Sequence, residues 1–167
     1  GGTSGTGSGG SGSASLKKYE SKDAYADGRA TVYRTPDGKL VRREGGSLAW
    51  RNNNPGNIRA GEFAKSLGAI GVGPGGFAIF PDAETGARAV GALMRTQNYK
   101  NLSIADAIAR YAPPSENNTA AYQAAIRKQT GLDSTRKMST LSDAELGRVV
   151  NAIRQHEGWK EGKTTTQ

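Results

Sequence analysis

Hydrophobic residues recur at helical spacing through the C-terminal half of the chain. Four stretches have this spacing: residues 83–97, 104–111, 115–130 and 142–157. In the first stretch, one helical face carries Ala89, Val90, Leu93 and Met94. A repeat of three and four residues between apolar positions is typical of an amphipathic α-helix. The pattern therefore predicts four helices.

Capping residues mark the ends of these stretches. Asp82, Ser103 and Ser115 precede the first three, and each side chain is of a kind that accepts from free N–H groups. Gly131 follows the third stretch, where a glycine commonly ends a helix in the left-handed conformation. Residues 142–145 (Ser-Asp-Ala-Glu) form a capping box that opens the fourth helix.

The preceding part of the chain favours short strands. Residues 29–34 and 39–43 are rich in Val, Thr and Tyr, and the turn sequence Thr-Pro-Asp-Gly at 35–38 joins them. Residues 77–80 (Phe-Ala-Ile-Phe) are a further extended segment in a glycine-rich region. We expect a mainly α (α+β) domain with a small N-terminal β-hairpin.

The two ends of the chain differ in composition from its centre. Residues 1–15 are only Gly, Ser, Thr and Ala, which is typical of a flexible linker. Residues 163–167 (Lys-Thr-Thr-Thr-Gln) contain no apolar side chain to bury, so we expect a disordered tail. One folded domain is therefore predicted over residues 16–162.

Charge and the lack of cysteine narrow the functional classes. The net charge of +8 favours an anionic partner, such as peptidoglycan, nucleic acid or acidic lipid. The basic residues are scattered rather than clustered, which argues against a nucleic-acid reader. With no cysteine and a single histidine, His156, a metal site of the usual N/S type is implausible. We expect no metal or organic cofactor, and no membrane insertion because the apolar runs are too short.

Residues 50–59 (Trp-Arg-Asn-Asn-Asn-Pro-Gly-Asn-Ile-Arg) are the most unusual run in the chain. Consecutive asparagines followed by proline and glycine interrupt both helix and regular strand. Two interpretations are open. The amides can bind the hydroxyl and acetamide groups of a glycan, or they can satisfy the backbone of a tight turn.

Glu157 is the first candidate for acid–base chemistry. Leu146, Val150, Ile153 and Glu157 lie on one face of the fourth predicted helix, so the carboxyl continues an apolar stripe. It also lies in the last turn, where the negative end of the helix dipole disfavours a second negative charge. Both effects favour the protonated carboxyl that a general acid needs. The alternative is a stripe that simply emerges into solvent.

Glu62 is the second candidate, because it lies in the predicted glycine-rich loop beside Phe63. Six other carboxylates have a sufficient structural explanation in predicted first helical turns, where they favour the positive end of the dipole: Asp82, Glu84, Asp106, Glu116, Asp143 and Glu145. Glu116 is the least secure of these, since it follows Pro113-Pro114 and can face a cleft. Tyr111, just before that corner, is the aromatic residue best placed to line a groove. His156 is interpreted either as a surface residue or as one that supports the site without touching the substrate.

Several motifs resemble lysozyme-like peptidoglycan-cleaving domains of phage virion proteins and of effectors of contractile bacterial secretion systems. They are the runs at residues 50–58, 61–64 (Gly-Glu-Phe-Ala), 68–71 (Gly-Ala-Ile-Gly), 76–81 (Gly-Phe-Ala-Ile-Phe-Pro), 111–117 (Tyr-Ala-Pro-Pro-Ser-Glu-Asn) and 156–159 (His-Glu-Gly-Trp). The resemblance covers roughly residues 28–162. In looser relatives of the lysozyme superfamily the helix with the catalytic glutamate precedes the Asn-rich loop. Here the order is reversed, which implies a circular permutation.

The resemblance implies cleavage of the β-1,4 bond between N-acetylmuramic acid and N-acetylglucosamine. It implies Glu157 as the general acid, Glu62 as the second carboxylate, and Asn54, Asn57, Tyr111 and Glu116 as substrate-binding residues. A lytic transglycosylase, an N-acetylglucosaminidase and a non-catalytic wall-binding or virion module are the alternatives.

The same resemblance implies where the protein acts and what it meets. We expect secretion or delivery, and action in the periplasm or cell wall of a target bacterium. The expected partners are peptidoglycan glycan strands, an immunity protein or inhibitor, and a larger parent polypeptide or secretion apparatus.

Overall fold

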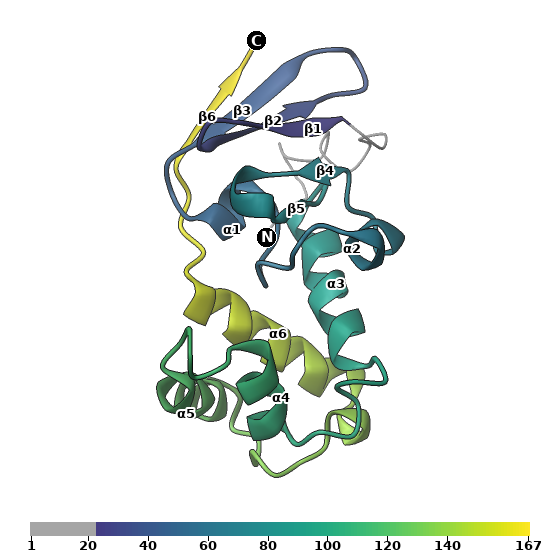
Figure 1. The fold of residues 1–167 in the computed structure, drawn as a ribbon, viewed down its shortest axis with the longest axis vertical. Coiled ribbons are helices and arrows are strands. Elements are labelled where there is room, and N and C mark those ends of the chain that lie inside the picture. The colour runs from purple at the N-terminus through teal and green to yellow at the C-terminus, as the bar shows by residue number, and fades with distance from the viewer. Residues whose placement is uncertain (1–22) are drawn as a thin grey trace. The chain divides into compact units, whose positions relative to one another are not determined.

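The computed structural model describes residues 23–167, which divide into two compact units (Figure 1). The first unit contains the described residues up to Ala89 together with Gly158–Gln167, and the second is Val90–Glu157. The sequence predicted one domain over residues 16–162. The boundary between the two units, after Ala89, lies inside the helix at Ala83–Met94. The predicted linker at residues 1–15 lies outside the described residues.

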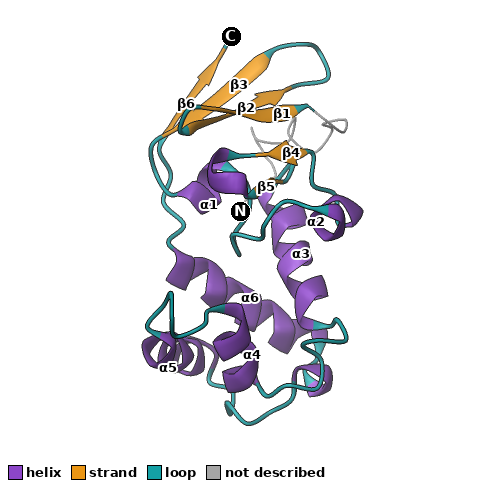
Figure 2. Ribbon diagram, in the orientation of Figure 1, coloured by secondary structure: helices purple, strands orange, loops and turns teal. Residues whose placement is uncertain are grey.

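The first unit is built on an antiparallel sheet with the strand order β1-β2-β3-β6 (Figure 2). Its strands are β1 (Ala24–Asp27), β2 (Ala30–Arg34), β3 (Leu40–Glu44) and β6 (Lys163–Thr166). The predicted hairpin at residues 29–43 is confirmed as β2 and β3, and Gly38 N–H donates to Thr35 O at 2.9 Å across its turn. A buried apolar cluster lies against this sheet: Ala24, Tyr33, Val41, Ile70 and Ile79.

The predicted disordered tail is wrong, because residues 163–166 form β6 along the edge of β3. Two backbone hydrogen bonds between Leu40 and Gln167, of 3.1 and 2.8 Å, extend the pairing. Threonine is β-branched and favours extended backbone. The strand is mostly exposed, so its hydrogen bonds and not apolar burial hold it, and a hydrophobic pattern could not reveal it.

Small elements complete the first unit. A two-stranded sheet pairs β4 (Gly71–Val72) with β5 (Ala78–Ile79), which confirms the extended segment predicted at 77–80. Two short helices that the sequence did not predict are α1 (Leu48–Arg51) and α2 (Glu62–Ser66). They have four and five residues, which is too short for a helical period to be visible.

The second unit contains helices α4 (Ile104–Tyr111), α5 (Thr119–Thr130) and α6 (Asp143–Glu157), together with the end of α3 (Ala83–Met94). The predicted caps at Asp82 and Ser103 are confirmed, since their side chains accept from Thr85 N–H at 2.7 Å and Asp106 N–H at 3.0 Å. The capping box is also confirmed, with Ser142 and Glu145 each bonding the other's backbone N–H, at 3.1 and 2.9 Å. Gly131 ends α5 with φ +70°.

The predicted start of α5 is wrong. Ser115 is not the cap; Asn118 is, and its Oδ1 accepts from Ala121 N–H at 3.1 Å. Residues 113–117 instead form a turn, in which the N–H groups of Glu116 and Asn117 both donate to Pro113 O. Proline restricts the backbone before it and supplies no donor, which delays the helix. Glu116 is therefore not in a first helical turn.

The fold is mixed α+β, with six α-helices and two antiparallel sheets among residues 23–167. The predicted combination of helices and a β-hairpin is thus correct, although the sheet is larger than the hairpin. No helix in the described part of the chain has both the length and the apolar character needed to cross a membrane.

Candidate functional site

The three consecutive asparagines of the first unit are buried, and each amide is used inside the protein. Asn52 Oδ1 accepts from Thr31 Oγ1 at 2.6 Å, which connects the run to β2. Asn53 Nδ2 donates to Phe80 O at 3.2 Å, beyond β5. The run therefore joins segments that are distant in sequence.

Asn54 corrects the prediction of a sugar-binding residue. Its side chain is fully buried; Nδ2 donates to Ile58 O and Ala78 O at 2.8 and 2.9 Å, and Oδ1 accepts from Ile58 N–H at 2.9 Å. Both amide protons and the carbonyl oxygen already have partners. A sugar could bind this amide only by breaking bonds that hold the loop, so the structural interpretation of the run applies to Asn54.

Asn57 differs from its three neighbours, because it is only half-buried and has φ +49°. Asparagine tolerates this left-handed conformation better than most residues. Of the two predicted sugar-binding residues of the run, it is the one that is not fully buried, although its Oδ1 atom is buried.

Arg43 and Gly86 support the asparagine run, and sequence reasoning missed both. The Arg43 guanidinium lies over the rings of Trp50 and Tyr33, at 4.8 and 5.5 Å, and donates to Trp50 O and Asn53 Oδ1. A Cβ added at Gly86 would lie 2.0 Å from Asn53 O, so only glycine fits there. An arginine in a strand and a glycine in a helix give no sequence signal for these contacts.

Glu62 begins helix α2 rather than lying in a loop, so the local prediction is wrong. Its side chain is 94% exposed, and it pairs with Lys65 Nζ at 3.5 Å. The positive end of the helix dipole accounts for a carboxylate at this position. Glu62 thus has the same structural explanation as the first-turn carboxylates excluded above.

Glu157 is the last residue of α6, as predicted, and continues a buried stripe of Leu146, Val150 and Ile153. The glutamate itself is half-buried. Its Oε2 accepts a hydrogen bond from the Tyr122 hydroxyl at 2.8 Å. The carboxyl is therefore held in a defined orientation at the rim of the apolar core of the second unit.

Tyr122 is supplied by α5 and is almost completely buried. Burial, and then the negative charge of Glu157, raise its pKa well above its usual range. The phenol therefore keeps its proton at any working pH and acts on Glu157 as a donor. Sequence reasoning treated Tyr122 only as one of several helical aromatics, and no local motif connects it to a residue 35 positions away.

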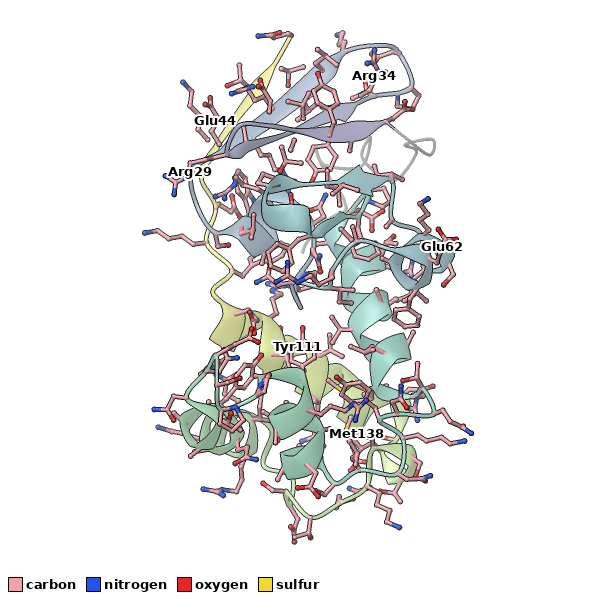
Figure 3. All side chains as sticks on the ribbon, in the orientation of Figure 1. Arg29, Arg34, Glu44, Glu62, Tyr111 and Met138 are labelled. Atoms are coloured by element: carbon pink, nitrogen blue, oxygen red, sulfur yellow. The ribbon has the colours of Figure 1, made fainter. Side chains whose placement is uncertain are left out.

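Tyr111 ends helix α4 and is half-buried. Burial is again the main cause that raises its pKa, followed by the charge of Glu157 and by Tyr99. Because the charge of Glu157 affects the pKa of this phenol, the ends of α4 and α6 lie near each other in the second unit. Tyr111 is labelled in Figure 3.

Two further predicted residues lie on the exposed side of the second unit. The ring of His156 is 3.9 Å from that of Tyr122, tilted by 35°, and the residue is exposed, as predicted. Glu116 is exposed on the turn at 113–117 and has no ion-pair partner among residues 23–167. Glu157, Tyr122 and Tyr111 therefore form the candidate site, with Glu116 on the loop that follows Tyr111.

A carboxyl held by a phenol suits proton transfer. No cluster of His, Cys, Asp and Glu side chains with the makings of a metal site occurs in residues 23–167. A carboxyl oriented by a neutral phenol can give a proton to a basic oxygen and accept one back. No protein-family model matches the chain, and no curated protein matches it at a significant level.

Proposed function

We propose that the protein cleaves the glycan strands of peptidoglycan, at the β-1,4 bond between N-acetylmuramic acid and N-acetylglucosamine. Glu157 is the general acid. One observation carries the proposal: the only carboxylate that continues the buried stripe of α6 is held by the hydroxyl of Tyr122 at 2.8 Å. The motifs that resemble lysozyme-like domains supply the substrate class.

In this reaction Glu157 gives its proton to the glycosidic oxygen, and the bond between that oxygen and the anomeric carbon breaks. The positive charge that develops on the sugar is stabilised by the carboxylate left behind. Water then adds to the anomeric carbon and returns a proton to Glu157. The fixed position of the carboxyl matters because proton transfer needs a short, aligned path.

The proposed sugar contacts in the second unit are Tyr111 and Glu116, neither of which is fully buried. Tyr111 offers a ring face and a phenol, and Glu116 offers a carboxylate on a proline-rich turn. Asn54 has no part in the proposal, because its amide is already bonded within the loop.

The proposed fold family is a circularly permuted lysozyme-like domain, in which the helix that ends in the catalytic glutamate closes the chain. The proposed setting is the cell wall of a target bacterium, reached as an antibacterial effector or a phage lytic domain. The net charge of +8 favours adhesion to an anionic wall. In that setting the parent polypeptide or secretion apparatus, and an immunity protein or inhibitor, are the proposed protein partners.

A lytic transglycosylase is the second candidate, and the position of Glu62 favours it. Glu62 is exposed to solvent and paired with Lys65 at the start of α2. Without a second catalytic carboxylate to activate water, the 6-hydroxyl of the muramic acid can attack the anomeric carbon instead. The product is then an anhydro sugar rather than a reducing end.

Digestion of purified peptidoglycan with the wild type and with Glu157→Gln tests the proposal. We expect soluble muropeptides from the wild type and almost none from the variant. Mass analysis of the ends distinguishes the reactions: a reducing muramic acid indicates a muramidase, an anhydro end a transglycosylase, and a reducing glucosamine a glucosaminidase. Equal release by the variant would contradict the role of Glu157. Wall binding by the wild type without release would leave only the binding module.

A further inference from the structure

An open cleft of about 860 Å³ lies in the first unit, between the β1–β2 turn, the end of β3 and helix α1. Five of the ten residues that line it are charged: Asp27, Arg29, Arg42, Glu44 and Arg51. A space of this size accommodates a short peptide. Figure 3 labels Arg29 and Glu44 near one end of the sheet and Arg34 near the other.

Arg42 is neutralised inside this cleft. Its Nη1 bonds Asp27 Oδ2, and its Nε lies 3.5 Å from Glu44 Oε2. The hydrogen bond to Asp27 is the main cause that raises the pKa of Arg42. The two carboxylates of the cleft are thus already paired with one cation.

Arg29 and Arg51 have no such counter-ion. Neither forms an ion pair with any residue in the described part of the chain. Burial lowers the pKa of Arg51, and the positive charge of Arg29 lowers it further. Two like charges that face one cleft and disfavour each other are stabilised by an anion between them.

The guanidinium of Arg51 is held in place. Nη1 donates to the carbonyls of Gly45 and Gly46 at 3.0 and 3.1 Å, and Nε is buried with no hydrogen-bond partner among the described residues. The backbone at Gly45 and Gly46 is closely packed, because a Cβ added at Gly46 would lie 2.4 Å from Lys160 O. A cation that is positioned before the ligand arrives loses little entropy on binding.

We propose that Arg29 and Arg51 bind a carboxylate of an acidic peptide, and that this peptide is the stem peptide of peptidoglycan. The identity of the peptide rests on the proposed function; the carboxylate site does not. Asp27 and Glu44 are paired with Arg42, so Arg29 and Arg51 are the two remaining charges of the cleft. Two positive charges suit one peptide carboxylate rather than a polyanion such as duplex nucleic acid.

Titration of the protein with the free tripeptide L-alanyl-γ-D-glutamyl-diaminopimelate, followed by NMR at low salt, tests the site. We expect shifts at the backbone of residues 27–30 and 45–51. Arg29→Gln should weaken binding by about tenfold, because one charge-assisted contact is lost. Arg34→Gln is the matched control, since Arg34 ends β2, the strand that follows Arg29, but lies outside the cleft, and it should change binding by less than about twofold.

Arg29→Glu is the second variant. Arg29 lies exposed on the β1–β2 turn, so this substitution should not disturb the packing of the fold. Its carboxylate would pair with Arg51, abolish peptide binding and raise the Tm. No shift at these residues in the wild type would overturn the proposal. An equal loss with Arg34→Gln, or tighter binding of inorganic phosphate than of the tripeptide, would overturn it as well.

The tripeptide contains no glycan, so this experiment separates the two proposals. Tripeptide binding without release of muropeptides would keep the carboxylate site and remove the proposed function. Release of muropeptides without tripeptide binding would do the opposite.

Discussion

The asparagine run of the first unit and the Glu157 site of the second unit use polar side chains in opposite ways. Asn54 is buried, and its amide bonds three backbone groups, two of Ile58 in its own loop and one of Ala78 in β5. Glu157 is half-buried, and one of its carboxyl oxygens accepts a hydrogen bond from the Tyr122 hydroxyl. The first arrangement connects loop and strand, whereas the second orients one titratable group.

The difference separates a structural motif from a chemical one. A side chain whose donors and acceptors are all satisfied within the protein gains stability but cannot exchange partners easily. A carboxyl that is fixed through one oxygen keeps its proton chemistry. Substitutions in the two regions should therefore affect different properties.

Glu157→Gln should have the largest effect on activity. The amide keeps the size of the side chain but cannot transfer the proton, so we expect release of muropeptides to fall by about a thousandfold. The Tm should change little, because Gln can still accept from Tyr122. Glu161→Gln, an exposed acid four residues further on, is the matched control and should retain activity.

Asn54→Ala should have the largest effect on stability. It removes the acceptor of the buried Ile58 N–H and one donor each from the carbonyls of Ile58 and Ala78, which costs about 3 kcal/mol of unfolding free energy. Urea unfolding measures this loss. Asn117→Ala, in an exposed turn, should cost less than about 0.5 kcal/mol. A fully stable Asn54→Ala that lost only its affinity for glycan would restore the sugar-binding interpretation.

Tyr122→Phe should have an intermediate effect on activity. The ring stays buried, but Glu157 loses the hydrogen bond from Tyr122 that helps to orient it, so we expect a drop of about tenfold. Release of muropeptides by the variant and the wild type measures the drop, and equal release would contradict a positioning role for Tyr122.

Glu145→Gln changes a carboxylate in the first turn of α6, at the opposite end of the helix from Glu157, where its role is structural. The hydrogen bond from Arg136 is the main cause that lowers the pKa of Glu145 from its ordinary value of 4.5 to about 2. Because the folded pKa is the lower one, the stabilisation is fully present above pH 4.5 and is lost as the pH falls towards 2. The Tm of Glu145→Gln should therefore lie below that of the wild type near neutral pH and converge with it near pH 2. A difference independent of pH would contradict the ion pair.

Glu62→Gln should have the smallest effect. Its carboxylate is 94% exposed and its partner Lys65 is three residues away on the same helix, so the pair contributes little. We expect activity within about twofold of the wild type. A loss comparable to that of Glu157→Gln would restore Glu62 as the second carboxylate and favour hydrolysis over transglycosylation.

Much of the fold could be predicted because its signals are local. Capping residues such as Asp82, Ser103 and Ser142 identify helix starts by contacts within three residues. The start of α5 was missed because several polar residues after Pro114 are each able to cap, and only the turn at 113–117 selects Asn118. Strand β6 was missed because its partner, β3, lies more than a hundred residues earlier.

The candidate site could be predicted only in part, for the same reason. The position of Glu157 on a buried stripe is a local pattern and was correct. Its hydrogen bond to Tyr122 joins two helices and leaves no periodic trace in the sequence. The asparagine run was equally ambiguous, because amides that bind a glycan and amides that bind the backbone look alike until their partners are known.

The most direct test measures Tm and muropeptide release on the same samples of Glu157→Gln and Asn54→Ala. We predict a crossed result: Glu157→Gln keeps its Tm and loses release, whereas Asn54→Ala loses Tm and keeps release per folded molecule. Release by Glu157→Gln at the rate of the wild type, from an equally stable protein, would contradict the assignment of Glu157 as the general acid.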